Sequence, residues 1–214
     1  MHIGIIGRVM SHLQIRELDQ DKPAKSRAFL FLEKIMARIT AADAGGANVL
    51  AFLDMLAWSE GTSTIKASDD GYNVLVGGQL FAGYDNHPRV LVPLPRYKIS
   101  STAAGRYQFL ARTWDAIVKN YGFKGRFIPE AQDLAAIKLL TECGALPLIK
   151  AGRIQEAIAK AAPIWASLPG AGYGQREHKL AALLGIYETE RGAEQQPEDQ
   201  LLAMFSACGG EMAA

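Results

Sequence analysis

A short apolar segment that ends in one carboxylate and a glycine is the most constraining feature of this 214-residue chain. Residues 52–59 read Phe-Leu-Asp-Met-Leu-Ala-Trp-Ser, and Glu60 and Gly61 follow directly. The spacing of apolar residues predicts a helix over residues 49–60. Lys and Arg are the usual residues of a last helical turn, because a helix C-terminus carries partial negative charge. Glu60 is therefore disfavoured as an anion, and such local violations are more frequent at functional sites.

The position of Glu60 is compatible with two interpretations. If apolar neighbours shield the carboxyl group, it holds its proton more tightly, as a general acid requires. Alternatively, the helix lies on the surface, Gly61 is its left-handed cap, and Glu60 is merely solvated. The helix alone does not decide between them.

Composition limits the class of protein. A chain of this length with 49% hydrophobic residues can form one domain with extensions. The net charge of +1 gives no broad surface for nucleic acid or an anionic membrane. The two cysteines, Cys143 and Cys208, exclude a disulfide-rich scaffold and leave open idle thiols or a single disulfide.

The chain shows no strong targeting or membrane signal. No apolar run approaches the roughly 18–20 residues that span a bilayer. Charged residues from Glu33 onward interrupt the best candidate for a secretory signal, residues 25–32. We therefore expect synthesis in the cytoplasm without a cleaved signal, and no stable membrane insertion.

Glycine and polar residues divide the chain into three regions. Residues 1–46 are expected to be an N-terminal extension of unknown role, because Gly45 and Gly46 resemble a linker. Residues 47–192 are expected to form the compact domain. A polar break then separates a tail, residues 193–214, that contains a possible short helix.

The compact region predicts an α+β protein. Residues 72–76 and 79–81 form a predicted hairpin around a Gly77-Gly78 turn, and residues 89–92 a possible third strand that Pro93 ends. Helices are predicted over residues 49–60, 105–121, 129–143, 154–162, 174–191 and 201–208. One helix, a small antiparallel sheet and then many helices is an α+β order with segregated elements.

Several common catalytic motifs are absent. The sequence contains no GxSxG, P-loop, GxGxxG, HExxH or CxxC motif. Its histidines, His2, His12, His87 and His178, do not lie at metal-ligand spacing from one another. We expect each to be solvated or packed, and we expect no metal and no cofactor.

Two segments combine amides with aromatic rings, the groups that bind sugar hydroxyls and cover sugar rings. One contains Tyr107 and Gln108, for which the alternative is a core tyrosine and a solvated glutamine. The other contains Trp165, Tyr173 and Gln175 among several glycines. Those glycines either turn the chain or let its backbone approach a ligand closely.

Seven blocks occur with characteristic order and spacing: Phe52–Thr62, Gly71-Tyr72, Val76–Gly78, His87–Arg89, Gly105–Gln108, Gly144–Pro147 and Ile164–Gln175. The last one, Ile-Trp-Ala-Ser-Leu-Pro-Gly-Ala-Gly-Tyr-Gly-Gln, is long and unusual in composition. In these blocks the chain resembles the lambda-like phage endolysins, which are lysozyme-like lytic transglycosylases. The resemblance runs from about Leu50 to Arg191.

The resemblance implies a lysozyme-like fold, mostly helical, with a small antiparallel sheet beside the active-site cleft. It implies cleavage of the β-1,4 bond between N-acetylmuramic acid and N-acetylglucosamine in peptidoglycan, with Glu60 as the catalytic residue. The implied substrate-binding residues are Ser59, Tyr72, Tyr107, Gln108, Trp165, Tyr173 and Gln175. We further expect a monomer that reaches the periplasmic cell wall through a holin-type partner.

In the implied mechanism one acid is sufficient. Glu60 protonates the glycosidic oxygen and then accepts the proton of the muramic acid C6 hydroxyl, which attacks C1 of the same sugar. The product is a 1,6-anhydromuramic acid end. Asn73 stands where the lambda-like pattern has Asp, and this departure favours a single acid.

Two alternatives are retained. A hydrolytic muramidase would pair Glu60 with Asp69 or Asp70, because most glycosidases use two carboxylates. Asp69 lies nine residues after Glu60, as in T4-type muramidases, but Leu75 replaces the threonine of that pattern. A non-catalytic peptidoglycan-binding or structural phage protein is the other alternative, although such a protein does not need Glu60.

Overall fold

The computed structural model describes residues 37–123 and 126–207, with side chains up to residue 193. In chain order its elements are α2 (Ala41–Ala44), α3 (Ala47–Ser59), β1 (Val92–Leu94), the 3-10 helix η1 (Pro95–Tyr97), β2 (Ile99–Ser101), α4 (Ala111–Tyr121), α5 (Pro129–Glu142), α6 (Leu146–Lys150), α7 (Ile154–Ala161) and α8 (Leu180–Ala207). Helices and one small antiparallel sheet confirm the predicted α+β class.

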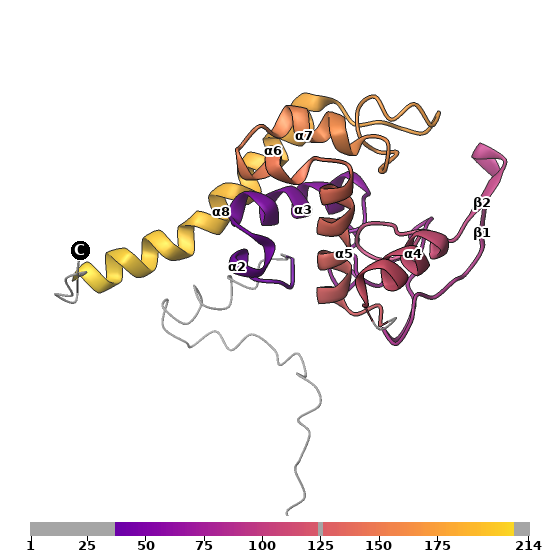
Figure 1. Cartoon of the computed structure of the whole chain (residues 1–214), viewed down its shortest axis with the longest axis horizontal. Helices are drawn as coiled ribbons and strands as arrows, with labels where there is room; N and C mark the ends of the chain where they lie inside the picture. The colour runs from indigo at the N-terminus through magenta and orange to yellow at the C-terminus, as the bar shows by residue number, and fades with distance from the viewer. Residues whose placement is uncertain (1–36, 124–125, 208–214) are drawn as a thin grey trace, which may run out of the picture. The chain divides into compact units, whose positions relative to one another are not determined.

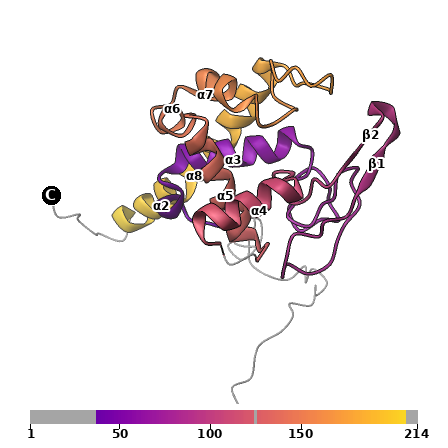
Figure 2. The same cartoon turned by 45° about the vertical axis from the view of Figure 1, so that its right-hand side comes forward.

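Helix α3 forms the centre of the core. Its residues from Val49 to Ala57 are all buried, and it packs against α2, α6 and α8. A helix that is apolar on all sides is stable only when other elements surround it. Figures 1 and 2 show α3 in the middle of the helices, with α6 and α7 on one side.

The predicted glycine stop of α3 is confirmed. Gly61 has φ 75°, its N–H donates to the Trp58 carbonyl at 2.9 Å, and the Thr62 N–H donates to the Ala57 carbonyl at 3.2 Å. This pair of bonds is a Schellman motif. Glu60 is the residue between the helix and the glycine, so the chain turns directly after the carboxylate.

The predicted hairpin forms only in part. Val74 and Leu80 make an isolated antiparallel bridge, and the Leu75 N–H donates to the Gln79 carbonyl at 2.7 Å. The turn at Gly77-Gly78 is present, with φ of 87° and 88°. The flanking residues do not extend into strands.

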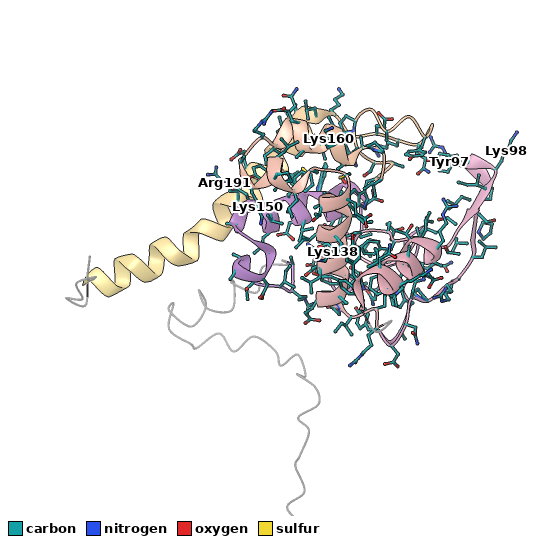
Figure 3. All side chains as sticks on the ribbon, in the orientation of Figure 1. Tyr97, Lys98, Lys138, Lys150, Lys160 and Arg191 are labelled. Carbon is teal, nitrogen blue, oxygen red and sulfur yellow. The ribbon has the colours of Figure 1, made fainter. Side chains whose placement is uncertain are left out.

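The predicted third strand is displaced and has a different partner. Strand β1 pairs with β2, and Pro93 lies inside β1 opposite Ser100 instead of ending it. Both strands of a two-stranded sheet are edges, where the missing N–H of proline is tolerated. Figure 3 shows Tyr97 and Lys98 at the outer end of this hairpin, which projects from the helices.

The predicted helices are correct where local pattern decides them. Helices α5 and α7 lie within one residue of the predicted ends. The helix predicted from residue 105 begins only at Ala111, because Gly105 adopts φ 80° and Ala104 pairs with Phe109. The five-residue helix α6 was not predicted.

The predicted break at residues 192–199 is wrong, because α8 is continuous from Leu180 to Ala207. It also begins six residues later than expected. The polar run Glu194-Gln195-Gln196 was interpreted as a loop, but Glu and Gln are good helix formers. The tail predicted from residue 193 is therefore largely the continuation of this helix.

The compact part begins earlier than the predicted residue 47. Ala37, Ile39 and Ala44 are buried in the core, and Thr40 caps α2. The rest of the predicted extension, residues 1–36, lies outside the described residues. Within the described ranges, no helix is both long and apolar enough to cross a membrane.

Candidate active site

The Glu60 carboxyl group lies between the end of α3 and the segment that follows α7. Its Oε1 accepts a hydrogen bond from Ser167 Oγ at 2.6 Å. Ser167 Oγ also lies 3.0 Å from the hydroxyl of Ser59, which is buried and donates to the Leu56 carbonyl at 2.8 Å. Glu60 as a residue is partly exposed, and its carboxyl group is anchored by the Ser167 hydroxyl.

Burial raises the pKa of Glu60 from its ordinary 4.5 to about 7, and the hydrogen bond from Ser167 opposes this by lowering it. Neither cause is a charged neighbour. A carboxyl group with a pKa near neutrality is substantially protonated at pH 7 and still able to release its proton. The structure therefore supports the shielded interpretation of Glu60 over the solvated one.

His178 fixes the helix end beside Glu60. Its Nε2 lies 3.0 Å from the Ser59 carbonyl oxygen, and its ring lies 4.7 Å from the Trp58 ring. Its backbone N–H donates to the Ser167 carbonyl at 2.9 Å. His178 thus holds both residues that flank the Glu60 carboxyl group, and it is a packed histidine, as expected.

Two predicted binding residues are accessible in the loop after Ser167. Tyr173 is 56% exposed, and its hydroxyl donates to the Pro163 carbonyl at 2.6 Å. This bond fixes the ring at the surface. Gln175 is also exposed.

Tyr72 and Tyr107 do not line a surface, which corrects the expectation from the sequence. Both side chains are buried, and both hydroxyls donate to Asp133 Oδ1 at 2.7 Å. Trp165 is also buried, and its indole N–H donates to the Tyr107 carbonyl at 3.1 Å. The three rings are occupied by protein contacts, so we assign them structural roles.

Gln108 is partly buried and turned toward the backbone. Its Nε2 donates to the carbonyls of Gly105 and Val74, at 3.0 and 3.3 Å. Its φ of 52° places it in the left-handed region. The amide stabilises the turn that the sequence had suggested as the start of a helix.

The two candidates for a second carboxylate both have cationic partners. Asp69 accepts a hydrogen bond from the Tyr84 hydroxyl at 2.7 Å and forms an ion pair with Arg38. Asp70 forms an ion pair with Arg106, whose side chain is only 1% exposed. Asn73 accepts a bond from the Asp69 N–H at 2.9 Å and so stabilises the turn.

In the part of the chain that the structure describes, no group of three or more His, Cys, Asp or Glu residues is arranged to hold a metal ion. His87 is a structural residue. Its Nε2 lies 2.8 Å from the Phe109 carbonyl and its Nδ1 accepts from the Arg89 N–H at 3.1 Å. Burial lowers its pKa, which favours the neutral ring that these bonds require.

A family model described as endolysin matches residues 50–194. The chain belongs to the endolysin family. It is 53% identical over 144 residues to the endolysin of Escherichia phage lambda. The aligned residues cover 66% of this chain and 90% of that protein. The endolysin of Escherichia phage P2 is 45% identical over 155 residues, 68% of this chain and 93% of the relative.

Solved structures show that the endolysin fold here is that of lambda lysozyme. A bacteriophage lambda lysozyme complexed with a chitohexasaccharide matches with a TM-score of 0.63 and 52% identity, over 65% of this chain and 91% of that one. A second lysozyme from bacteriophage lambda matches with a TM-score of 0.58 and 44% identity, over 71% and 94%. The expected lysozyme-like fold is confirmed.

Three residues of this candidate site were not identified from the sequence. Ser167, Glu177 and His178 bind Glu60, the glycine-rich loop and the end of α3, respectively. Ser167 and the loop belong to the unusual block at residues 164–175, which was the only available signal. Glu177 and His178 follow in a segment of ordinary polar composition.

Proposed function

We propose that this endolysin is a lytic transglycosylase of peptidoglycan in which Glu60 is the single acid and base. Its relatives are named endolysins, and one matched lysozyme is described as complexed with a chitohexasaccharide. Chitin oligosaccharides share the β-1,4-linked N-acetylglucosamine units of peptidoglycan strands. The proposed substrate is therefore the glycan strand, cleaved between N-acetylmuramic acid and N-acetylglucosamine.

The observation that carries the proposal is the raised pKa of Glu60, about 7, caused by burial without a charged partner. The protonated carboxyl group gives its proton to the glycosidic oxygen as the bond from C1 of muramic acid breaks. The C6 hydroxyl of the same sugar then attacks C1, and the Glu60 carboxylate accepts its proton. The leaving strand keeps a free 4-hydroxyl, and the new end is 1,6-anhydromuramic acid.

The surroundings of Asp69 and Asp70 favour one carboxylate over two. Most glycoside hydrolases use a second carboxylate, which either activates water or bonds covalently to the sugar. Asp69 is held by Arg38 and Tyr84, and Asp70 by Arg106. Intramolecular attack needs no such group, because the nucleophile belongs to the substrate and is already close.

Substrate contacts are proposed for Tyr173 and Gln175, which are exposed in the loop that follows Ser167. We further propose that the protein acts as a monomer on the periplasmic cell wall and needs a holin-type partner for release. The family suggests this route.

The test combines wall clearing with product analysis. Wild-type protein is expected to lower the turbidity of purified cell walls, and Glu60→Gln to abolish this, because the amide cannot supply a proton. Glu156→Gln, which alters only an exposed ion pair with Arg153, is the matched control and is expected to clear walls normally. Equal clearing by Glu60→Gln would reject Glu60 as the acid.

Mass spectrometry of the released muropeptides distinguishes the two enzyme classes. Anhydro ends are lighter by one water than the reducing ends that a hydrolase leaves. Reducing muramic acid as the main product would reject the transglycosylase mechanism. Binding of walls without any clearing by the wild type would favour the non-catalytic alternative.

A further inference from the structure

The loop over residues 168–175, here called the glycine loop, is stabilised by few interactions of its own. Gly170, Gly172 and Gly174 have φ of 82°, 73° and 68°. A side chain built at any of them would meet nothing within 4 Å. Glycine loses more conformational freedom on ordering than any other residue, so a loop with three of them needs external support to keep one shape.

Glu177 supplies that support. Its Oε2 accepts the Gly170 N–H and its Oε1 accepts the Gly172 N–H, both at 2.9 Å. Each carboxylate oxygen therefore accepts the N–H of one glycine in the left-handed conformation. Hydrogen bonds from backbone amides to an ionised carboxylate are stronger than neutral ones.

His178, the residue after Glu177, contacts the surroundings of Glu60. The backbone N–H of His178 donates to the Ser167 carbonyl at 2.9 Å, and its ring Nε2 lies 3.0 Å from the Ser59 carbonyl oxygen. Ser167 binds the Glu60 carboxyl group, and Ser59 precedes Glu60 in the chain. Two consecutive residues thus fix the glycine loop on one side and the surroundings of Glu60 on the other.

We propose that Glu177 is a positioning residue that holds the glycine loop in its glycan-binding shape, while His178 fixes that loop relative to Glu60. The proposal rests on the proposed function, because it assigns the glycine loop to glycan binding. The hydrogen bonds of Glu177 go to the glycine loop, and that of Glu60 comes from Ser167. Loss of Glu177 should therefore weaken binding and leave the acid intact.

The variant Glu177→Gln tests this with little change in size. Its amide has one acceptor oxygen, so one of the two glycine N–H groups loses its partner and faces an NH₂ group instead. Amide hydrogen exchange at Gly170 or Gly172 is expected to speed up. Binding of chitohexaose, measured by titration calorimetry, should weaken about five- to tenfold, the factor that corresponds to one lost hydrogen bond.

The kinetic pattern separates positioning from general damage. In Glu177→Gln, KM on soluble glycan strands is expected to rise by the same factor as the Kd for chitohexaose, with kcat within about twofold of wild type. The control Glu156→Gln should change neither constant. Thermal unfolding of both variants is expected near that of wild type, since Glu177 is exposed.

Acidification gives a second readout. The two amide bonds hold the pKa of Glu177 below its ordinary 4.5, Gly172 having the larger effect. Chitohexaose binding by wild type should therefore weaken as the pH falls through that lowered pKa, whereas binding by Glu177→Gln should change less. Over this range Glu60 stays protonated, because its own pKa is about 7.

Each outcome is decisive. Unchanged amide exchange and unchanged chitohexaose affinity in Glu177→Gln would overturn the proposal, as would a fall in kcat with unchanged affinity. If wild type fails to clear cell walls but Glu177→Gln still binds chitohexaose more weakly, the proposed function fails and the positioning role of Glu177 stands.

Discussion

Two effects on the Glu60 carboxyl group, burial and a hydrogen bond, shift its pKa in opposite directions. Burial at the end of α3 disfavours the carboxylate and raises the pKa, and the Ser167 hydroxyl donates to the carboxylate and lowers it. Burial dominates, and the pKa settles near neutrality. An acid of this strength keeps its proton until the glycosidic oxygen needs it and can take one back from the C6 hydroxyl.

Removal of the Ser167 hydroxyl should strengthen the hold of Glu60 on its proton. In Ser167→Ala the pKa of Glu60 is expected to rise further, because the hydrogen bond from Ser167, which lowers it, is gone. The alkaline limb of the pH–rate profile should move to higher pH. The rate at the optimum should fall by about tenfold or less, the value of one orienting hydrogen bond.

The measurement is the pH dependence of kcat/KM on soluble glycan strands for wild type and Ser167→Ala. Thr189→Ala, which removes an exposed hydroxyl from α8, is the control and should leave the profile unchanged. An alkaline limb that moves to lower pH in Ser167→Ala would contradict this account of the site.

At the scale of the element, the end of α3 sets the direction of Glu60. The helix stops because Gly61 adopts a left-handed conformation that few other residues reach without strain. The added Cβ of an alanine at this position would meet nothing within 4 Å, so the cost of the substitution is conformational and not steric. Gly185 in α8 also has open space around it but lies in a regular helix.

These two glycines predict stability changes of opposite sign. Gly61→Ala is expected to lower the free energy of unfolding by about 1–2 kcal/mol, the cost of a left-handed alanine. Gly185→Ala should raise it by about 0.5–1 kcal/mol, because alanine favours a helix. Urea denaturation measures both, and a gain in stability from Gly61→Ala would show that the helix end does not need this conformation.

At the scale of the whole molecule, a buried polar network joins distant parts of the chain. Arg106 forms ion pairs with Asp54 of α3 and with Asp70. Asp133 of α5 accepts bonds from Tyr72, Tyr107 and the Arg38 N–H. Burial raises the pKa of Asp54 and Asp133, while Arg106 opposes this in both. These groups connect the loop after Glu60 to two core helices.

The sequence predicted the features of the fold that depend on neighbouring residues, but not the side-chain pairings between distant parts of the chain. The stop at Gly61 and helices α5 and α7 depend on neighbouring residues, so local pattern was sufficient. Tyr72 and Asp133 are 61 residues apart, and the Ser167–Glu60 bond spans 107. Such pairings arise from the complete fold, and a tyrosine that binds sugar has the same local sequence as one that binds a buried aspartate.

Burial of the Glu60 carboxyl group should lower the free energy of unfolding of the wild type at neutral pH, by an amount that depends on the pH. The unfolded carboxyl group ionises near pH 4.5 and the folded one near 7. Between these values the folded state binds more protons, so the stability of wild type falls as the pH rises through this range. Glu60→Gln stays neutral throughout. Its free energy of unfolding should match wild type below about pH 4.5 and exceed it above about pH 7, by up to about 3 kcal/mol.

Urea denaturation of both proteins at several pH values measures this difference directly. The control Glu156→Gln, which alters only an exposed ion pair with Arg153, should stay close to wild type at all of these pH values, because exposed ion pairs contribute little to stability. A stability difference between wild type and Glu60→Gln that does not change with pH would mean that Glu60 is solvated in the folded protein. The raised pKa on which the single-acid mechanism depends would then be lost. If the difference in free energy of unfolding between Glu60→Gln and wild type grows with pH, the fold itself raises the pKa of Glu60. That result would not depend on any assay of activity.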